Sequence, residues 1–111
     1  MRVQVIMDRP LGSRHPRFPE LAYPVNYGYV PGVPGGDGEE QDVYVLGVAV
    51  PLERFEGEVI AVIRRADDVE EKWVAAPEGV RFTAEEIRQQ VAFQERFFDS
   101  TVHVLSEGET P

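Results

Sequence analysis

A stretch dense in proline and glycine limits the fold of this chain more than any other feature. Between Ser13 and Asp42, ten positions are proline or glycine: Pro16, Pro19, Pro24, Gly28, Pro31, Gly32, Pro34, Gly35, Gly36 and Gly38. Proline removes a helical hydrogen bond and clashes with the preceding turn, so this stretch cannot be a helix. It is also too rich in aromatic residues to be a disordered linker. It therefore predicts an ordered loop with short extended pieces.

Runs of β-favouring residues lie on both sides of this stretch. A first run precedes it at Val3–Met7, and three more follow it at Val43–Val50, Glu58–Arg65 and Lys72–Ala76. The run at Val43–Val50 is almost continuously apolar, which indicates a strand that is buried on both faces. Successive runs leave no room for helices between them. This spacing favours a meander or a small barrel over βαβ units.

One helix is clearly indicated near the C-terminal end. Thr83 is a predicted N-cap, and Glu86 completes a capping box three residues later. An apolar stripe at helical spacing follows, formed by Ala84, Ile87, Val91 and Phe98. We therefore predict a helix that runs to about Phe98, followed by a last strand at Thr101–Leu105.

Composition sets limits on the class of protein. A chain of 111 residues is predicted to form a single domain, residues 1–111. Its net charge of −9 argues against nucleic-acid binding, which needs a basic surface. The start of the chain has no long apolar segment, and nothing later resembles a membrane span, so we expect a cytoplasmic protein without a membrane partner. The absence of cysteine excludes thiolate chemistry.

Two acidic segments are the candidates for chemistry. The first is a glycine-rich turn that carries Asp37, Glu39, Glu40 and Asp42 directly before a predicted strand. Hard cations such as Mg²⁺ prefer such oxygen ligands, although a solvated acidic turn explains this segment equally well. The second is Asp67-Asp68-Val69-Glu70-Glu71, followed by Lys72, which by itself indicates a charged hairpin turn. If the strands at 43–50 and 58–65 are neighbours, both segments reach one end of the barrel.

A longer motif resembles a known family. Tyr23-Pro24-Val25-Asn26-Tyr27-Gly28-Tyr29 is followed by Asp37-Gly38-x-x-x-Asp42-Val43 and then by the acidic segment that ends in Lys72. This arrangement resembles soluble inorganic pyrophosphatases from about Tyr23 to Lys72, with the C-terminal helix in its expected place. The resemblance implies a mainly β (α+β) fold, a five-stranded OB-like barrel with one C-terminal helix packed against it. It also implies Mg²⁺ as cofactor, with Mn²⁺ as the alternative, hydrolysis of pyrophosphate, and a homo-oligomer.

The same resemblance assigns roles to individual residues. It implies catalytic roles for Glu39 and Asp37, with Glu39 in the place of the carboxylate that deprotonates the attacking water. The implied metal ligands are Asp37, Glu39, Asp42, Asp67 and Glu70. The implied phosphate contacts are Tyr27, Lys72 and one of Arg14 and Arg17.

The chain departs from the family pattern at the end of the predicted helix. Phe97 and Phe98 stand where the family has a Tyr-Lys pair that grips phosphate. Loss of these donors predicts weaker stabilisation of the transition state and hence a weak activity. Two alternatives follow: the same site acts on another small phosphoanhydride or phosphoester, such as a nucleotide, or the barrel is a catalytically inactive binding module.

Overall fold

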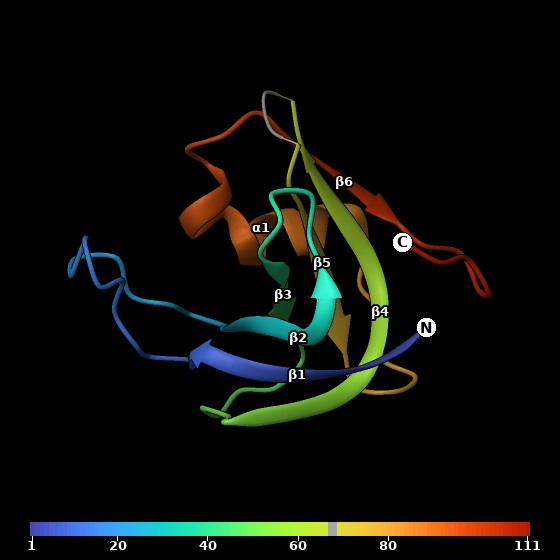
Figure 1. Cartoon of the computed structure of the whole chain (residues 1–111), viewed down its shortest axis with the longest axis horizontal. Helices are drawn as coiled ribbons and strands as arrows, with labels where there is room; N and C mark the ends of the chain where they lie inside the picture. Colours follow the sequence, from blue (N-terminus) through green and yellow to red (C-terminus); the bar gives the residue numbers. More distant parts are fainter. Residues whose placement is uncertain (67–68) are drawn as a thin grey trace.

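The computed structural model of this protein describes residues 1–66 and 69–111 (Figure 1). Its elements follow one another in the order β1 (Arg2–Arg9), β2 (Asn26–Pro34), β3 (Glu40–Val45), β4 (Arg54–Arg65), β5 (Glu71–Ala76), α1 (Ala84–Glu95) and β6 (Ser100–Val104). Among the described residues, no helix is both long and apolar enough to cross a lipid bilayer.

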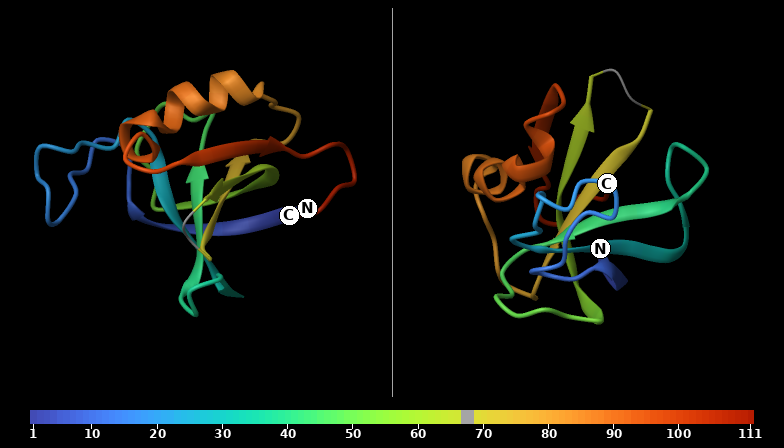
Figure 2. Two further views of the ribbon diagram at one scale, coloured as in Figure 1. Left: turned by 90° about the horizontal axis from the view of Figure 1, so that it is seen from above. Right: turned by 90° about the vertical axis from the view of Figure 1, so that its left-hand side faces the viewer.

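Five strands close into a barrel. Their order is β1-β2-β3-β5-β4, and β1 pairs again with β4 to complete the circle. All these pairs are antiparallel except β3 with β5, which run parallel. Strand β6 continues the sheet along β4, and α1 packs against one side of the barrel (Figures 1 and 2). The predicted five-stranded OB-like barrel with a C-terminal helix is therefore confirmed.

The apolar residues of β3 pack into two hydrophobic clusters, one on each face of the strand. Val43 and Val45 belong to a hydrophobic cluster with side chains from β1 and β4, whereas Tyr44 belongs to a second cluster. That second cluster includes Ile87 and Val91 of α1. Because alternate side chains of a strand point to opposite faces, both faces of β3 must be apolar. The predicted burial on both faces is confirmed for this part of the run.

Strand β2 is longer than the extended pieces expected in the proline- and glycine-rich stretch. It pairs regularly with β3 from Asn26 to Val30, and its prolines follow in an irregular part where the register shifts. Such a bulge is where a strand tolerates proline. A Cβ atom at Gly28 would lie 2.0 Å from the carbonyl oxygen of Ile6, so glycine is needed for the close approach of β1.

Two predicted elements end earlier than expected. Strand β3 stops at Val45 rather than Val50, because Gly47 has a φ of +84° that turns the chain out of the sheet. Helix α1 begins at the predicted capping box, in which Thr83 and Glu86 bond each other's backbone. It ends at Glu95, and Phe98 therefore lies beyond the helix instead of completing its apolar stripe.

Candidate active site

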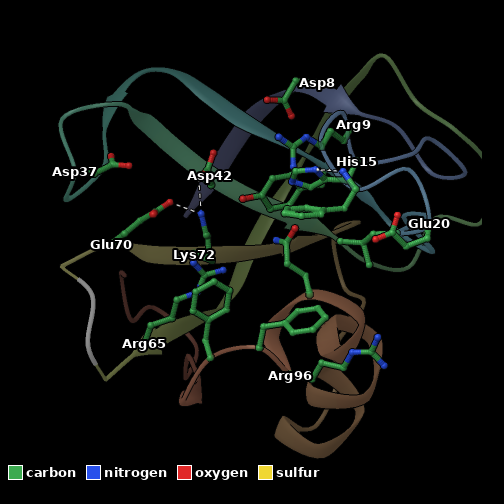
Figure 3. Close-up of a pocket in the computed structure, with 16 residues that line it drawn as sticks. Asp8, Arg9, His15, Glu20, Asp37, Asp42, Arg65, Glu70, Lys72 and Arg96 are labelled. Carbon is green, nitrogen blue, oxygen red and sulfur yellow. Dashed lines mark hydrogen bonds and ion pairs between the residues drawn. The ribbon is translucent and has the colours of Figure 1, made fainter.

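A cavity of about 700 Å³ lies at the C-terminal end of β1, beside the β2–β3 and β4–β5 connections (Figure 3). Its lining includes these charged and polar groups: Asp8, Arg9, Glu20, Tyr27, Asp37, Asp42, Arg65, Glu70, Lys72, Gln94 and Arg96. Within it, we call Asp8, Asp42, Glu70 and Lys72 the charged wall. The other lining residues, which we call the aromatic wall, are apolar or aromatic: His15, Phe18, Leu21, Phe97 and Phe98.

The two acidic segments meet because of the barrel topology. Strands β3 and β5 are parallel neighbours, so they begin at the same end of the barrel. Strand β4 is not a neighbour of β3, the condition considered above, but β5 lies between them and carries the second acidic segment to the same place. A Cβ atom at Gly36 would lie 2.1 Å from the carbonyl oxygen of Val69, so the two loops touch. This contact supports the convergence that the sequence suggested.

Lys72 is the centre of the charged wall. Its ammonium nitrogen lies 2.6 Å from Oδ2 of Asp42 and also bonds the carboxylate of Glu70. Figure 3 shows these two carboxylates pointing at Lys72 from different sides. The side chain of Lys72 is only 6 % exposed, and the ring of Tyr27 lies 5.8 Å from its nitrogen. A buried ammonium group of this kind needs partners, and the two carboxylates provide them.

The pKa values in this group move in opposite directions. Burial and the hydrogen bond to Asp42 both raise the pKa of Glu70 above its ordinary range. Burial acts to raise the pKa of Asp42 as well, but hydrogen bonds from Glu70 and Lys72 outweigh it and lower that pKa. Burial acts to lower the pKa of Lys72, yet its interactions with Tyr27 and its hydrogen bonds with Asp42 and Glu70 outweigh burial and raise that pKa well above its usual value. Of these two carboxylates, Asp42 is therefore the one that stays ionised to the lower pH.

A second, buried ion pair adjoins the pocket, and its arginine is one of the lining residues. Arg65 donates from Nε to Glu95 at 3.1 Å and from Nη2 to the same carboxylate at 2.7 Å. The side chains are only 8 % and 5 % exposed. Tyr44 and Ser100 donate to the Glu95 carboxylate as well. The ring centre of Phe98 lies 3.6 Å from the Arg65 guanidinium carbon, so this pair also holds one ring of the aromatic wall.

Sequence reasoning missed Asp8, Arg9 and Arg65, all of which line the cavity. Burial, the largest effect, raises the pKa of Asp8, and the negative charge of Asp42 adds to it. Arg9 donates to the hydroxyl of Tyr23 at 2.5 Å. The charged pair Asp8-Arg9 at the end of an apolar run was a signal that could have identified this end of β1. Arg65 ends β4 in the same way.

The other predicted site residues are placed differently. Asp37 lines the cavity, but it lies on the β2–β3 hairpin apart from Lys72 and accepts a bond from the backbone of Glu39 (Figure 3). Glu39 is exposed and is not among the lining residues. Arg14 and Arg17 are also exposed and outside the lining, and Arg14 donates to the carbonyl of Pro19 at 2.7 Å. Asp67 lies outside the described residues.

The donor set of the cavity suits a hard divalent cation. Within residues 1–66 and 69–111, no three acidic or histidine side chains form a ready-made metal group. Mg²⁺, however, is usually held by one or two carboxylates together with waters and substrate phosphates. Asp42 and Glu70 already converge on one positive charge, the ammonium of Lys72. The cavity therefore provides the type of donor that Mg²⁺ prefers.

Comparison with known proteins bears on the family and the fold of the chain. A sequence model of the inorganic pyrophosphatase family matches residues 6–104. The inorganic pyrophosphatase of Ehrlichia chaffeensis superimposes with a TM-score of 0.70 at 16 % identity, over 93 % of this chain and 85 % of that one. The pyrophosphatase of Neisseria gonorrhoeae gives 0.65 at 24 % identity, over 95 % and 80 % of the two chains.

A third structure, the pyrophosphatase of Coxiella burnetii, gives a TM-score of 0.67 at 20 % identity, over 93 % of this chain and 83 % of that one. At these identities the structural likeness bears on the fold alone. No curated protein matches the chain in sequence. The family match covers most of the chain, including β1 to β6 apart from the first residues of β1. The chain therefore belongs to the inorganic pyrophosphatase family, a family of diphosphatase enzymes.

Proposed function

We propose that this protein is a Mg²⁺-dependent inorganic pyrophosphatase that hydrolyses pyrophosphate to two phosphates. The observation that carries the proposal is the convergence of Asp42 and Glu70 on Lys72, beside Tyr27, in one cavity of a pyrophosphatase-family barrel. Pyrophosphate is a small polyanion, and its cleavage depends on charge neutralisation and positioning. Carboxylates and an ammonium group in one cavity offer the means for both.

The carboxylates are the proposed holders of the cation. Asp42 and Glu70 line the cavity together with Asp37, and Asp67 and Glu39 complete the set that the family resemblance implies. Mn²⁺ is the alternative cation. When bound, such a cation neutralises phosphoryl charge and lowers the pKa of a water molecule. Asp42 suits this task because its lowered pKa keeps it ionised.

The remaining side chains are proposed to act on the substrate. Lys72 and Tyr27 are proposed to donate hydrogen bonds to a phosphoryl group from the buried side of the cavity. Glu39 is proposed as the general base that takes the proton of the attacking water. Arg14 or Arg17 remains the proposed outer phosphate contact, and Arg9, which lines the cavity, adds a third candidate cation.

Two further expectations belong to this proposal. We expect a homo-oligomer, supported by the exposed apolar side chains of Met1 and Val69 outside the cavity lining. We also expect the protein to act in the cytoplasm. Light scattering of the purified protein and fractionation of the source cells test these two points.

The test of the proposed function is phosphate release from Mg²⁺-pyrophosphate by the wild type and by Asp42→Asn. Removal of one fixed charge from such a site is expected to lower the rate about 100-fold or more. Glu53→Gln is the matched control, because Glu53 is exposed and lies outside the cavity lining. Equal rates in the wild type and Asp42→Asn, or no release by either, would contradict the proposal.

A further inference from the structure

We infer that the aromatic wall is a binding site for a planar aromatic group carried by the phosphate substrate. This inference rests on the proposed function, because it uses the charged wall as the phosphate-binding and hydrolytic part. The substrate class then extends from pyrophosphate to phosphoanhydrides that bear an aromatic ring, such as nucleoside diphosphates. The first observation is that both walls belong to one continuous cavity.

The exposed phenylalanines are concentrated at this cavity. Phe18, Phe97 and Phe98 are 53 %, 65 % and 46 % exposed, and all three line it. Full burial of a phenylalanine side chain stabilises a fold by roughly 1.5–3 kcal/mol, and these exposed rings do not contribute that full stabilisation. Val50 is also exposed, at 57 %, but it lies outside the lining. A cluster of exposed aromatic rings beside polar groups is typical of a ligand site.

One ring of the wall rests on a rigid support. The Arg65 guanidinium lies against the ring of Phe98, and Glu95 fixes that guanidinium through two hydrogen bonds. The guanidinium of Arg96 lies 5.0 Å from the ring centre of Phe97. A ring that is held in place loses little side-chain entropy when a second ring stacks on it. The aromatic wall is therefore a prepared surface for stacking.

The size of the cavity favours an occupant larger than pyrophosphate. A cavity of about 700 Å³ lies within the range of sites that hold drug-sized ligands, roughly 300–1,000 Å³. Two phosphoryl groups fill only part of it, and apolar side chains give no hydrogen bonds to a phosphoryl group. Lys72 and Arg65 are already paired with carboxylates. Stacking of a base on an aromatic side chain adds roughly 1–3 kcal/mol without requiring another cation.

The reaction on such a substrate is the same hydrolysis. The oxygen of a water molecule forms a bond to the terminal phosphorus of a nucleoside diphosphate, and the bond from that phosphorus to the bridging oxygen breaks. The electron pair of the broken bond stays on the bridging oxygen, which becomes part of the nucleoside monophosphate. One proton of the water passes to a carboxylate and then to solvent, and orthophosphate is the second product.

The experiment measures kcat/KM for phosphate release from three substrates in the presence of Mg²⁺: pyrophosphate, adenosine diphosphate and methyl diphosphate. Methyl diphosphate has the same anhydride bond and ester charge as the nucleotide but no ring. In the wild type we expect adenosine diphosphate to be preferred over methyl diphosphate at least fivefold. In Phe97→Ser this preference falls at least fivefold. Val50→Ser is the control, because Val50 is similarly exposed but lies outside the cavity, and it keeps the wild-type preference.

The outcomes separate the inference from the proposed function. Release from pyrophosphate alone, or an unchanged preference in Phe97→Ser, overturns the inference and leaves the proposed function standing. Release from adenosine diphosphate with the expected loss in Phe97→Ser, but none from pyrophosphate, supports the inference and contradicts pyrophosphate as the substrate. If Phe97→Ser changes only the oligomeric state measured by light scattering, the wall is a subunit contact and the inference is wrong. Unfolding in urea verifies that the variant is folded.

Discussion

Three of the four residues of the charged wall lie in barrel strands, whereas the aromatic wall lies on segments outside the strands. Asp42 and Lys72 belong to β3 and β5, and the Lys72 side chain is only 6 % exposed. Phe18 lies between β1 and β2, and Phe97 and Phe98 follow the end of α1. Groups on rigid elements keep precise positions, and groups on connecting segments vary more readily in evolution. The contrast suggests that one wall sets the chemistry and the other sets the choice of substrate.

The largest expected effect tests the buried ion pair of Arg65 and Glu95. Glu95→Gln leaves Arg65 buried without its charged partner, and we expect a loss of about 3 kcal/mol in the free energy of unfolding. Urea denaturation at pH 7 measures it. Glu85→Gln is the control, because Glu85 forms an exposed ion pair with Arg88 on the same helix and should cost less than about 1 kcal/mol. Similar small losses in both variants would show that the buried pair does not stabilise the pocket.

The same pair predicts a pH dependence of stability. Burial acts to raise the pKa of Glu95, but hydrogen bonds from Arg65, Ser100 and Tyr44 outweigh it and lower that pKa. A carboxyl group with a lowered pKa in the folded state stabilises the protein above its unfolded pKa and stops doing so as the pH falls through the folded pKa. The wild type should therefore lose its stability advantage over Glu95→Gln below about pH 4.5. An advantage that grows on acidification would contradict this assignment.

The next effect concerns the charged wall alone. Lys72→Gln leaves Asp42 and Glu70 without the ammonium group that both carboxylates bond. We expect kcat/KM for pyrophosphate to fall about 100-fold, since a fixed charge at the phosphoryl group is lost. Arg64→Gln removes a cation from an exposed pair with Glu71 on the neighbouring strand and serves as the control. A Lys72→Gln variant as active as Arg64→Gln would show that Lys72 is only structural.

A smaller effect is expected from Tyr27, whose ring lies 5.8 Å from the Lys72 nitrogen. Tyr27→Phe removes one hydroxyl group from a buried site, and the loss of a hydrogen bond of about 1–1.5 kcal/mol predicts a roughly tenfold fall in kcat/KM. Tyr29→Phe, two residues along β2 and outside the cavity lining, should leave kcat/KM unchanged. Steady-state kinetics with pyrophosphate compares the two. Equal values in both variants would remove Tyr27 from the substrate contacts.

The smallest effect on stability is expected in the aromatic wall. Phe18 is 53 % exposed and lies outside the strands, so Phe18→Ser should change the free energy of unfolding by no more than about 0.5 kcal/mol. Urea denaturation measures this change. A loss of 2 kcal/mol or more would mean that the aromatic wall is part of the folded core, and the contrast between the walls would fail.

The sequence predicted those features that depend on neighbouring residues or on a family motif. The capping box of Thr83 and Glu86 is local, and the structure contains it at the expected place. The family motif pointed to Asp42 and Lys72, and in the structure these two side chains form an ion pair. Asp8 and Arg65 were missed because only closure of the barrel brings the ends of β1 and β4 to the same cavity. The charged residues at the ends of the two apolar runs are a local signal, but which strand ends share a cavity depends on long-range pairing.

The misplaced ends of elements have a similar cause. The apolar run at Val43–Val50 predicted a longer strand, but the positive φ of Gly47 ends the pairing before Val48. The apolar stripe predicted a helix to Phe98, yet Arg65 provides a stacking partner for that ring outside the helix. Hydrophobic pattern alone does not distinguish a side chain that fills the core from one that lines a cavity.

Phosphate release from pyrophosphate across a titration of Mg²⁺ tests whether hydrolysis depends on a cation held by Asp42. The assay starts from protein treated with a chelator and raises Mg²⁺ to millimolar concentrations in the wild type and in Asp42→Asn. We expect no release without the cation, a saturable rise in the wild type, and a rise at least about 100-fold smaller in Asp42→Asn. Release that is independent of Mg²⁺, or its absence at every concentration, would contradict the account.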